Sequence, residues 1–152
     1  MFVFVGLAMS IPAISQDVHT SATTGLWSDA STWNEGVPNL SGNTLDITIQ
    51  SGDTVTADEA LRFKKSSTIT IEANAKLIIS VLLEVDILDA AKNFTIIVEE
   101  GGELLIDGNF DAAKDANLTI DGSAEVTGNL SLGSGATITV DSDGTTGGSL
   151  QI

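Results

Sequence analysis

A short pattern recurs along this chain: two apolar residues flank a threonine, and an acidic residue follows, with single departures in two copies. Five copies align, at Ile47–Gln50, Ile69–Glu72, Ile96–Glu99, Leu118–Asp121 and Ile138–Asp141. Their third residues, Ile49, Ile71, Val98, Ile120 and Val140, are separated by 22, 27, 22 and 20 residues. A near-constant period of this size is typical of a solenoid, in which each repeat buries its apolar face against its neighbours.

The apolar residues of the repeat alternate with polar ones, as the strand period of two requires when one face points inward. A second inward strand is predicted to start six residues after each anchor, at Val55, Leu77, Leu104, Val126 and, in a polar departure, Thr146. Coils of 20 to 22 residues are longer than the roughly 18 of a hexapeptide left-handed helix. The predicted fold class is therefore all-β, a single-stranded parallel β-helix (β-solenoid), right-handed, with about five coils of 20–27 residues over residues 46–152.

Two further details follow from the spacing. The interval of 27 residues predicts a longer strand over residues 79–88 and a surface loop near Ala90 and Lys92. A second marker, Gly-Asn or Gly-Ser before an apolar residue, recurs every 20 residues at Gly108, Gly128 and Gly148.

The charge of the chain excludes several classes of function. Lys and Arg total 6 against 21 Asp and Glu, which gives a net charge of -15. This field repels phosphate backbones and anionic lipid headgroups, so nucleic acid is not an expected partner. The chain has no cysteine, which excludes disulfides, thiolate metal sites and a thiol nucleophile.

The first 15 residues form an apolar run that is too short for a membrane span, which needs about 20 residues. We interpret residues 1–15 as a secretory signal-like segment with cleavage before Gln16, although no basic residue precedes the apolar run. A retained apolar strand that packs on the solenoid is the alternative. The signal interpretation predicts a secreted or cell-surface protein with no membrane insertion after processing.

Residues 16–45 are polar and irregular in pattern, and we interpret them as an N-terminal cap region. The end of a stacked core needs a cover for its apolar side chains and unpaired strand edges, and the large rings of Trp27 and Trp33 suit that task. The functional alternative is that Trp27 or Trp33 stacks against a sugar ring, because indole faces match the apolar faces of pyranoses.

Outward residues of stacked strands also align in columns. One predicted column holds Thr48, Thr70, Ile97, Thr119 and Thr139, and a neighbouring one holds Asp46, Thr68, Thr95, Asn117 and Thr137. Threonine is common on exposed strands because its branched side chain suits a pleated surface. Paired threonine columns also resemble the ice-binding faces of some antifreeze proteins, so ice binding is a remote alternative function.

A third predicted column is acidic and holds Gln50, Glu72, Glu99, Asp121 and Asp141. A bound cation would relieve the repulsion between stacked carboxylates. Asp141 and Asp143, in Asp-Ser-Asp-Gly, have the spacing of the start of a Ca²⁺ loop, but the later ligands of an EF-hand are missing. Calcium at this loop is one hypothesis, and an ordinary Asp-Gly turn is the other.

No catalytic constellation emerges from the sequence. His19 is the only histidine, lies outside the repeats and is expected to be an exposed side chain without a catalytic partner. Acidic pairs are abundant, but none is singled out by an apolar pocket. We therefore expect a non-enzymatic protein that needs no cofactor, with Ca²⁺ as the one candidate ligand ion.

The run from Trp27 to Pro38, followed by Gly42, Ile47-Thr48-Ile49, Gly52 and Val55, resembles the opening of the eight-glycine (G-eight) domain of extracellular proteins. It also looks like the start of many secreted bacterial parallel β-helix adhesins. The resemblance implies an extracellular or cell-surface location in a bacterium and an association with surface glycans. It carries no catalytic residue over to this chain.

The residues Ser149–Ile152 still have the pattern of a strand, so we expect an uncovered apolar coil end, which either more chain or another subunit would cover. A head-to-tail contact that does not close into a ring generates a filament. The leading hypothesis is a secreted, non-catalytic structural or adhesive solenoid that self-associates through its coil ends. The alternative is an extracellular carbohydrate-binding or glycan-processing module.

Overall fold

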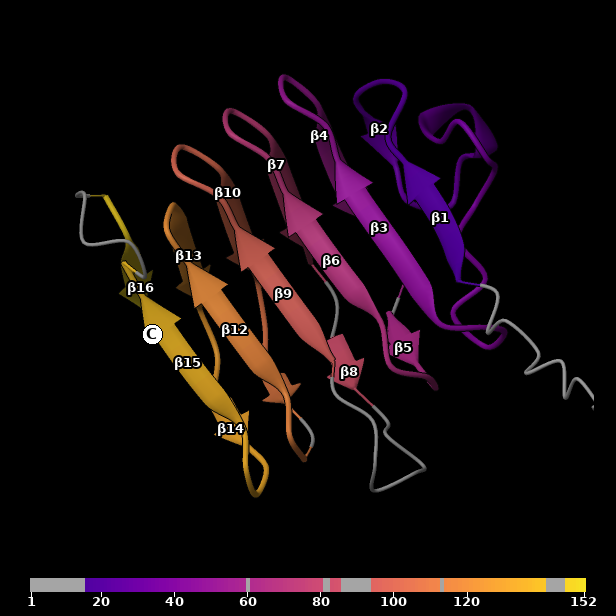
Figure 1. The fold of residues 1–152 in the computed structure, drawn as a ribbon. Coiled ribbons are helices and arrows are strands. Elements are labelled where there is room, and N and C mark those ends of the chain that lie inside the picture. Colours follow the sequence, from indigo (N-terminus) through magenta and orange to yellow (C-terminus); the bar gives the residue numbers. More distant parts are fainter. Residues whose placement is uncertain (1–15, 60, 81–82, 86–93, 113, 142–146) are drawn as a thin grey trace, which may run out of the picture.

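The computed structural model describes residues 16–59, 61–80, 83–85, 94–112, 114–141 and 147–152. These residues form three parallel β-sheets, which we number by the order in which the chain enters them (Figure 1). The all-β class and the parallel pairing predicted from the sequence are confirmed.

Sheet 1 has six strands, whose repeats Ile-Thr-Ile and Leu-Thr-Ile supply β-branched and apolar residues that suit a pleated, half-buried surface. In spatial order they are β1 (Asp17–Thr20), β3 (Leu45–Ile49), β6 (Thr68–Ile71), β9 (Thr95–Val98), β12 (Asn117–Ile120) and β15 (Thr137–Val140).

Sheet 2 also has six strands, and sheet 3 has four. Sheet 2 runs through β2 (Gly25–Leu26), β4 (Thr54–Ala57), β7 (Lys76–Ile79), β10 (Glu103–Ile106), β13 (Ser123–Val126) and β16 (Ser149–Gln151). Sheet 3 runs through β5 (Arg62–Phe63), β8 (Leu83–Val85), β11 (Phe110–Ala112) and β14 (Leu130–Leu132).

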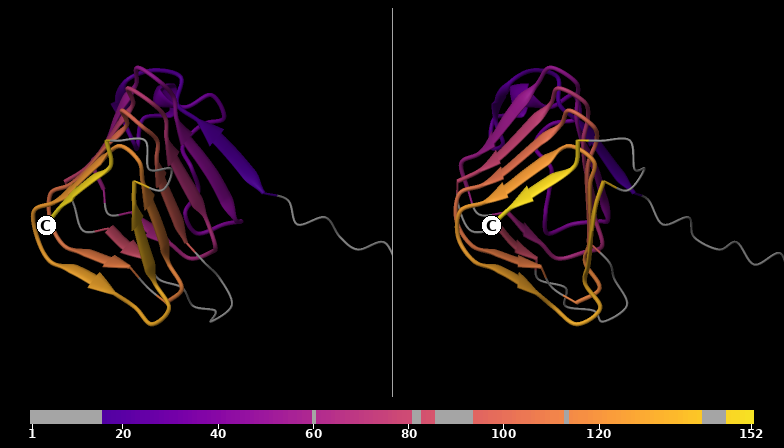
Figure 2. Two further views of the ribbon diagram at one scale, coloured as in Figure 1. Left: turned by 60° about the vertical axis from the view of Figure 1, so that its left-hand side comes forward. Right: turned by 90° about the vertical axis from the view of Figure 1, so that its left-hand side faces the viewer.

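From β3 to β16 the chain visits sheets 1, 2 and 3 in turn and then returns to sheet 1 one layer further along. Viewed along the stack, the sheets enclose a three-sided core (Figure 2). This connectivity is compatible with a β-solenoid, because each strand pairs with its equivalents in the layers before and after it.

The core is a set of stacked apolar columns. Ile47, Ile69, Ile96, Leu118 and Ile138 are register partners in sheet 1, as the alignment of the repeats predicts. All of them except the last are buried. The inward residues of sheets 2 and 3 complete the core, with Phe63 and Phe94 packed at a ring-centroid distance of 4.8 Å.

The structure corrects the predicted start of the second strand in one layer. Val55, Leu77 and Leu104 are register partners, but the next partner is Ala124, and Val126 pairs with Ile106 instead. The cause is the corner between sheets 1 and 2. It spans four residues after β1, β3, β6 and β9 but only two, Asp121 and Gly122, after β12. Val126 stays buried because a shift of two residues returns a strand to the same face.

The two-residue corner requires glycine. A side chain on Gly122 would collide with the carbonyl oxygens of Glu99 and Gly102, which lie on the layer below. At the longer corners, the backbone instead turns through positive φ at Gly52, Asn74 and Gly101. The Gly52 N–H donates to Asn74, and the Asn74 N–H donates to Gly101, so these corners stack through hydrogen bonds.

Two other expectations need correction. Residues 16–45 contain β1, β2 and a short 3-10 helix, Ala30–Thr32, where an irregular pattern was predicted. The marker at Gly108 and Gly128 precedes strands of sheet 3, but Gly148 precedes β16 of sheet 2, so the third copy is not equivalent. Of the predicted strand 79–88, Leu83–Val85 is β8; the predicted loop near Ala90 and Lys92, Thr146 and the signal-like residues 1–15 lie outside the described residues.

Candidate functional site

One end of the stack is not covered by any of the residues that the structure describes. In the described part of the chain, β14, β15 and β16 are the last strands of their sheets, and each pairs on one side only. Inward residues of this layer are correspondingly exposed: Leu132 is 47% and Val140 is 40% accessible, whereas Ile120, the register partner of Val140 one layer below, is 0%. We call the surface formed by Leu130–Leu132, Ala136–Val140 and Ser149–Gln151 the open end.

The open end carries very little charge. Among the described residues from Thr127 onward, Asp141 has the only ionisable side chain. Most of the 21 acidic residues of the chain precede Thr127 in the sequence. The half-exposed apolar side chains and the unpaired edges of three adjacent strands are both unfavourable in water, so this end has the character of a contact surface.

The opposite end of the stack is closed by the residues predicted as a cap. Trp27 is fully buried and Trp33 is 4% accessible. Their rings meet edge to face at a centroid distance of 4.9 Å, and the Trp33 indole N–H donates to the Trp27 carbonyl oxygen at 2.9 Å. Neither ring offers a face to a sugar, so the packing interpretation of both tryptophans holds and the stacking platform is not formed.

Polar side chains complete the closed end. Ser21 is fully buried; its hydroxyl donates to the Asp53 carboxylate at 2.6 Å and accepts the Gln50 N–H at 2.8 Å. His19, expected to be exposed, instead points into the stack in β1, where it is 8% accessible. Its Nδ1 lies 3.0 Å from the Gly36 carbonyl oxygen, to which it donates, so this histidine fixes the cap.

Two exposed carboxylates near the closed end have a lowered pKa. The Ser31 backbone N–H and hydroxyl, each 2.8 Å from the Asp29 carboxylate, lower the pKa of Asp29. The Ser28 hydroxyl, 2.6 Å from the carboxylate of Asp58, lowers the pKa of Asp58. In both cases the donors stabilise the ionised carboxylate, so these hydrogen bonds are strongest when the carboxyl group is ionised.

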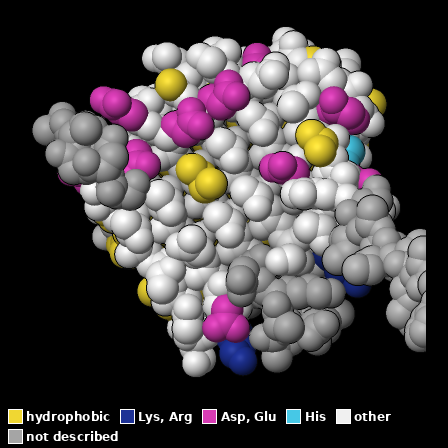
Figure 3. Space-filling view, viewed as in Figure 1, with side chains coloured by type: hydrophobic (Ala, Val, Ile, Leu, Met, Phe, Trp, Pro, Cys, Tyr) yellow, Lys and Arg dark blue, Asp and Glu magenta, His cyan; other side chains and the backbone are white. Residues whose placement is uncertain are grey.

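The outward face of sheet 1 carries the predicted threonine columns. Thr48, Thr70, Ile97, Thr119 and Thr139 are register partners, and Thr20 of β1 extends the column by one strand that the sequence did not reveal. The centre of this face is largely uncharged, with acidic side chains gathered toward the corner with sheet 2 (Figure 3). Ice binding by this face stays a prediction.

The calcium hypothesis gains no support from the described residues. Asp141 lies at the corner after β15 with a φ of 56°, and Asp143 lies outside the described residues. Within the described ranges, no three His, Asp or Glu side chains converge in a way that would hold a metal ion. In the acidic column, Glu72 accepts the Ser51 N–H at 2.9 Å. Calcium at Asp141 and Asp143 remains a prediction.

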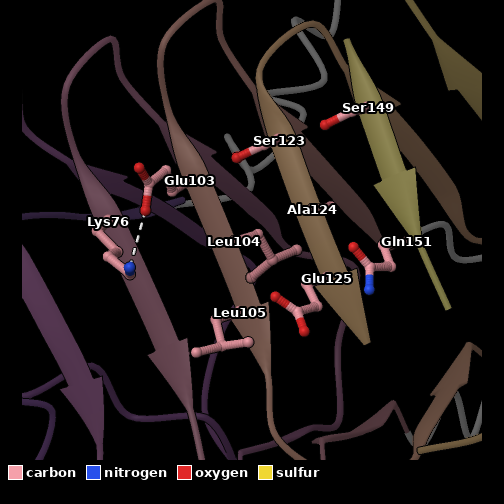
Figure 4. Close-up of a pocket in the computed structure, with 9 residues that line it drawn as sticks. All are labelled: Lys76, Glu103, Leu104, Leu105, Ser123, Ala124, Glu125, Ser149 and Gln151. Atoms are coloured by element: carbon pink, nitrogen blue, oxygen red, sulfur yellow. Dashed lines mark ion pairs between the residues drawn. The ribbon is translucent and has the colours of Figure 1, made fainter. Parts of the chain in front are cut away.

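A shallow depression of about 150 Å³ lies on the outer face of sheet 2, next to β16 (Figure 4). Lys76 and Glu103 form an ion pair of 2.8 Å at one side of it. Leu105, Ser123 and Glu125 lie across its floor, where the small Ser123 side chain leaves the space. This depression was not predicted from the sequence because the outward residues of sheet 2 show no repeated pattern.

Comparison with known proteins adds no relative. No protein-family model matches the chain, and neither a curated protein nor a solved structure is significantly similar to it. Among the described residues, no helix has the length and apolar character needed to cross a membrane.

Proposed function

We propose that this chain is a non-catalytic, secreted or cell-surface structural or adhesive protein. In this proposal it is a right-handed β-solenoid of about five coils that self-associates through its open end. The G-eight-like opening and the bacterial extracellular setting belong to the same proposal, and they rest on the residues from Trp27 to Val55.

One observation carries the proposal, namely the exposure of inward residues at the open end. Leu132 and Val140 belong to columns whose members in the layer below, Ala112 and Ile120, are fully buried. Full burial of such a side chain stabilises a protein by about 1.5–3 kcal/mol, so covering two half-exposed ones contributes roughly that amount in total. The unpaired N–H and C=O groups at the edges of three strands can in addition form hydrogen bonds with strands of the partner.

Sedimentation of the purified chain over a concentration series tests the proposal. We expect the mean mass to rise with concentration for wild type and to stay at the monomer value for Val140→Lys, because the new charge would be buried in the contact. Ile97→Lys is the matched control: it places the same charge on the outward face of β9, away from both ends. A wild-type chain that remains monomeric at every concentration would overturn the proposal.

The second candidate function is carbohydrate binding at the depression of sheet 2. The observation that favours it is a hollow lined by a Lys–Glu pair, a second carboxylate and hydroxyl groups, which supply donors and acceptors for sugar hydroxyls. A glycan array probed with wild type and with Ser123→Phe, which fills the hollow, tests it. Loss of a signal in Ser123→Phe but not in Thr119→Phe, on sheet 1, would support binding there; a wild-type array without signal would exclude it.

A further inference from the structure

We propose that the open end binds the open end of a second copy, so that association stops at a two-fold symmetric dimer and does not continue into a filament. The inference rests on the self-association proposed above and names the surface of the partner. This symmetric dimer is an alternative to a head-to-tail contact, in which the open end of one copy would bind the closed end of the next.

In sheet 1, the edge of the closed end is occupied around Thr20, near the end of β1. The Thr20 N–H points away from the neighbouring strand β3 and donates to the Glu35 carboxylate at 2.8 Å. The Thr20 carbonyl accepts the Asn34 N–H at 3.0 Å. An antiparallel bridge between Ser21 and Trp33 continues this contact. A strand that arrives from another copy would have to break these bonds before it paired with β1.

Sheets 2 and 3 are occupied at the same end. The Leu26 carbonyl of β2 accepts the Asp29 N–H at 3.2 Å, and the Lys64 N–H, directly after β5, donates to the Leu40 carbonyl at 3.2 Å. Trp33 is buried behind them, and each of the three sheets therefore has at least one hydrogen bond from its own chain at this end. The open end lacks such partners among the described residues.

Charge favours the same pairing. Residues 16–59, which form the closed end and its first layers, contain seven acidic residues and no Lys or Arg: Asp17, Asp29, Glu35, Asp46, Asp53, Asp58 and Glu59. The open end has no cationic side chain to attract this acidic surface. Two open ends, each with Asp141 as the only described ionisable side chain, meet with little repulsion.

A two-fold axis also satisfies the strand geometry. An axis across the stack reverses the strand direction, so β15 meets the β15 of the second copy in an antiparallel pair, and β16 meets β14. With the axis at Thr139, Ile138 lies opposite the partner's Val140, and both point inward as the period of two requires. The exchanged strands also match in length, because β14 and β16 have three residues each.

Single cysteines provide the test, since the native chain has none. In the symmetric dimer, two copies of Thr139→Cys face each other at the Cα separation of about 4.5–5.5 Å that antiparallel neighbours have, which suits a disulfide. We expect at least about tenfold more disulfide-linked dimer from Thr139→Cys than from Thr70→Cys, because contact raises the effective concentration of the thiols. Thr70 lies in the same outward column, in the middle of the sheet.

Each outcome decides a separate point. A head-to-tail contact would extend the column and place Thr139 beside the Thr20 of the next copy, so a dominant mixed disulfide between Thr20→Cys and Thr139→Cys overturns the two-fold dimer. A wild-type mass that grows beyond that of a dimer also overturns the two-fold dimer, but it leaves the proposed self-association intact. A stable dimer without a Thr139→Cys disulfide overturns the antiparallel β15 pairing. A monomer at all concentrations overturns both proposals.

Discussion

The two ends of the stack have the same strand architecture but opposite surfaces. At the closed end Trp27 and Trp33 cover the core, while Glu35 and Asn34 occupy the edge of β1. At the open end, the described residues cover neither the core nor the strand edges. This difference shows that the end of a solenoid is closed by two separate features. Bulky side chains cover the apolar core, and hydrogen-bond partners occupy the strand edge.

The largest expected effect comes from removing the cover. Trp33→Ala should lower the free energy of unfolding by about 3–5 kcal/mol, because it leaves a cavity and removes the bond to the Trp27 carbonyl. Leu132→Ala, at the open end, should cost less than about 1.5 kcal/mol, since its side chain is half exposed. Urea unfolding below the association range measures both, and equal losses would mean that the ends do not differ as described.

Removing the edge partner should have a smaller effect on stability and a visible effect on assembly. Glu35→Ala loses the carboxylate that accepts the Thr20 N–H at 2.8 Å, which should cost about 1–2 kcal/mol at this exposed site. It also frees the edge of β1, so sedimentation should detect species larger than a dimer. Glu59→Ala removes another exposed acidic side chain from residues 16–59, and it should neither lower stability nor produce species larger than a dimer. A Glu35→Ala chain that stays dimeric would show that the carboxylate is not what protects the edge.

The closed end should also be the acid-sensitive one. Asp29 and Asp58 have a lowered pKa in the folded chain, so their contribution to stability is present above the unfolded value of 3.8 and is lost as the pH falls through the folded value. The melting temperature should therefore decrease between about pH 5 and pH 3, with a shallower slope in Ser28→Ala/Ser31→Ala, which lacks the donor hydroxyls. Identical slopes in the two proteins would contradict this assignment.

The smallest expected effect concerns the charge at the open end. Asp141→Asn should tighten the dimer by about two- to fivefold at low salt, and less at high salt, because two like charges no longer approach. Asparagine tolerates the positive φ of 56° at this position, so the corner should keep its shape. Asp111→Asn, on the outward face of sheet 3, is the control that should leave the dimer unchanged.

The sequence predicted sheet 1 from β3 to β15 with the correct register, because its inward residues are apolar in every layer. It did not predict β1, whose inward residues, His19 and the following Ser21, are polar and are buried only through partners distant in the chain. Of sheet 3, only β8 lies within a predicted strand, since strands of two or three residues are too short to show a period.

The candidate sites also differ in whether the sequence predicts them. The exposed end could be expected from the apolar pattern of the last residues, because the layers before them are covered by neighbours. The burial of both tryptophans could not be settled from composition, because indole rings suit a core and a sugar equally well. The occupied edge of β1 depends on Glu35 and Thr20, which lie 15 residues apart and share no motif.

The short corner of Asp121 and Gly122 bears on how chains of this kind change length in evolution. The corners between sheets 1 and 2 that lie wholly within the described residues have four residues or two, and the coil with the shorter corner is the one with a period of 20 in place of 22. Insertions and deletions in pairs leave every inward residue inward, whereas a change of one residue would turn the following strand inside out. Length variation among homologous solenoids should therefore occur in even steps at this corner, accompanied by glycine wherever the corner is shortest.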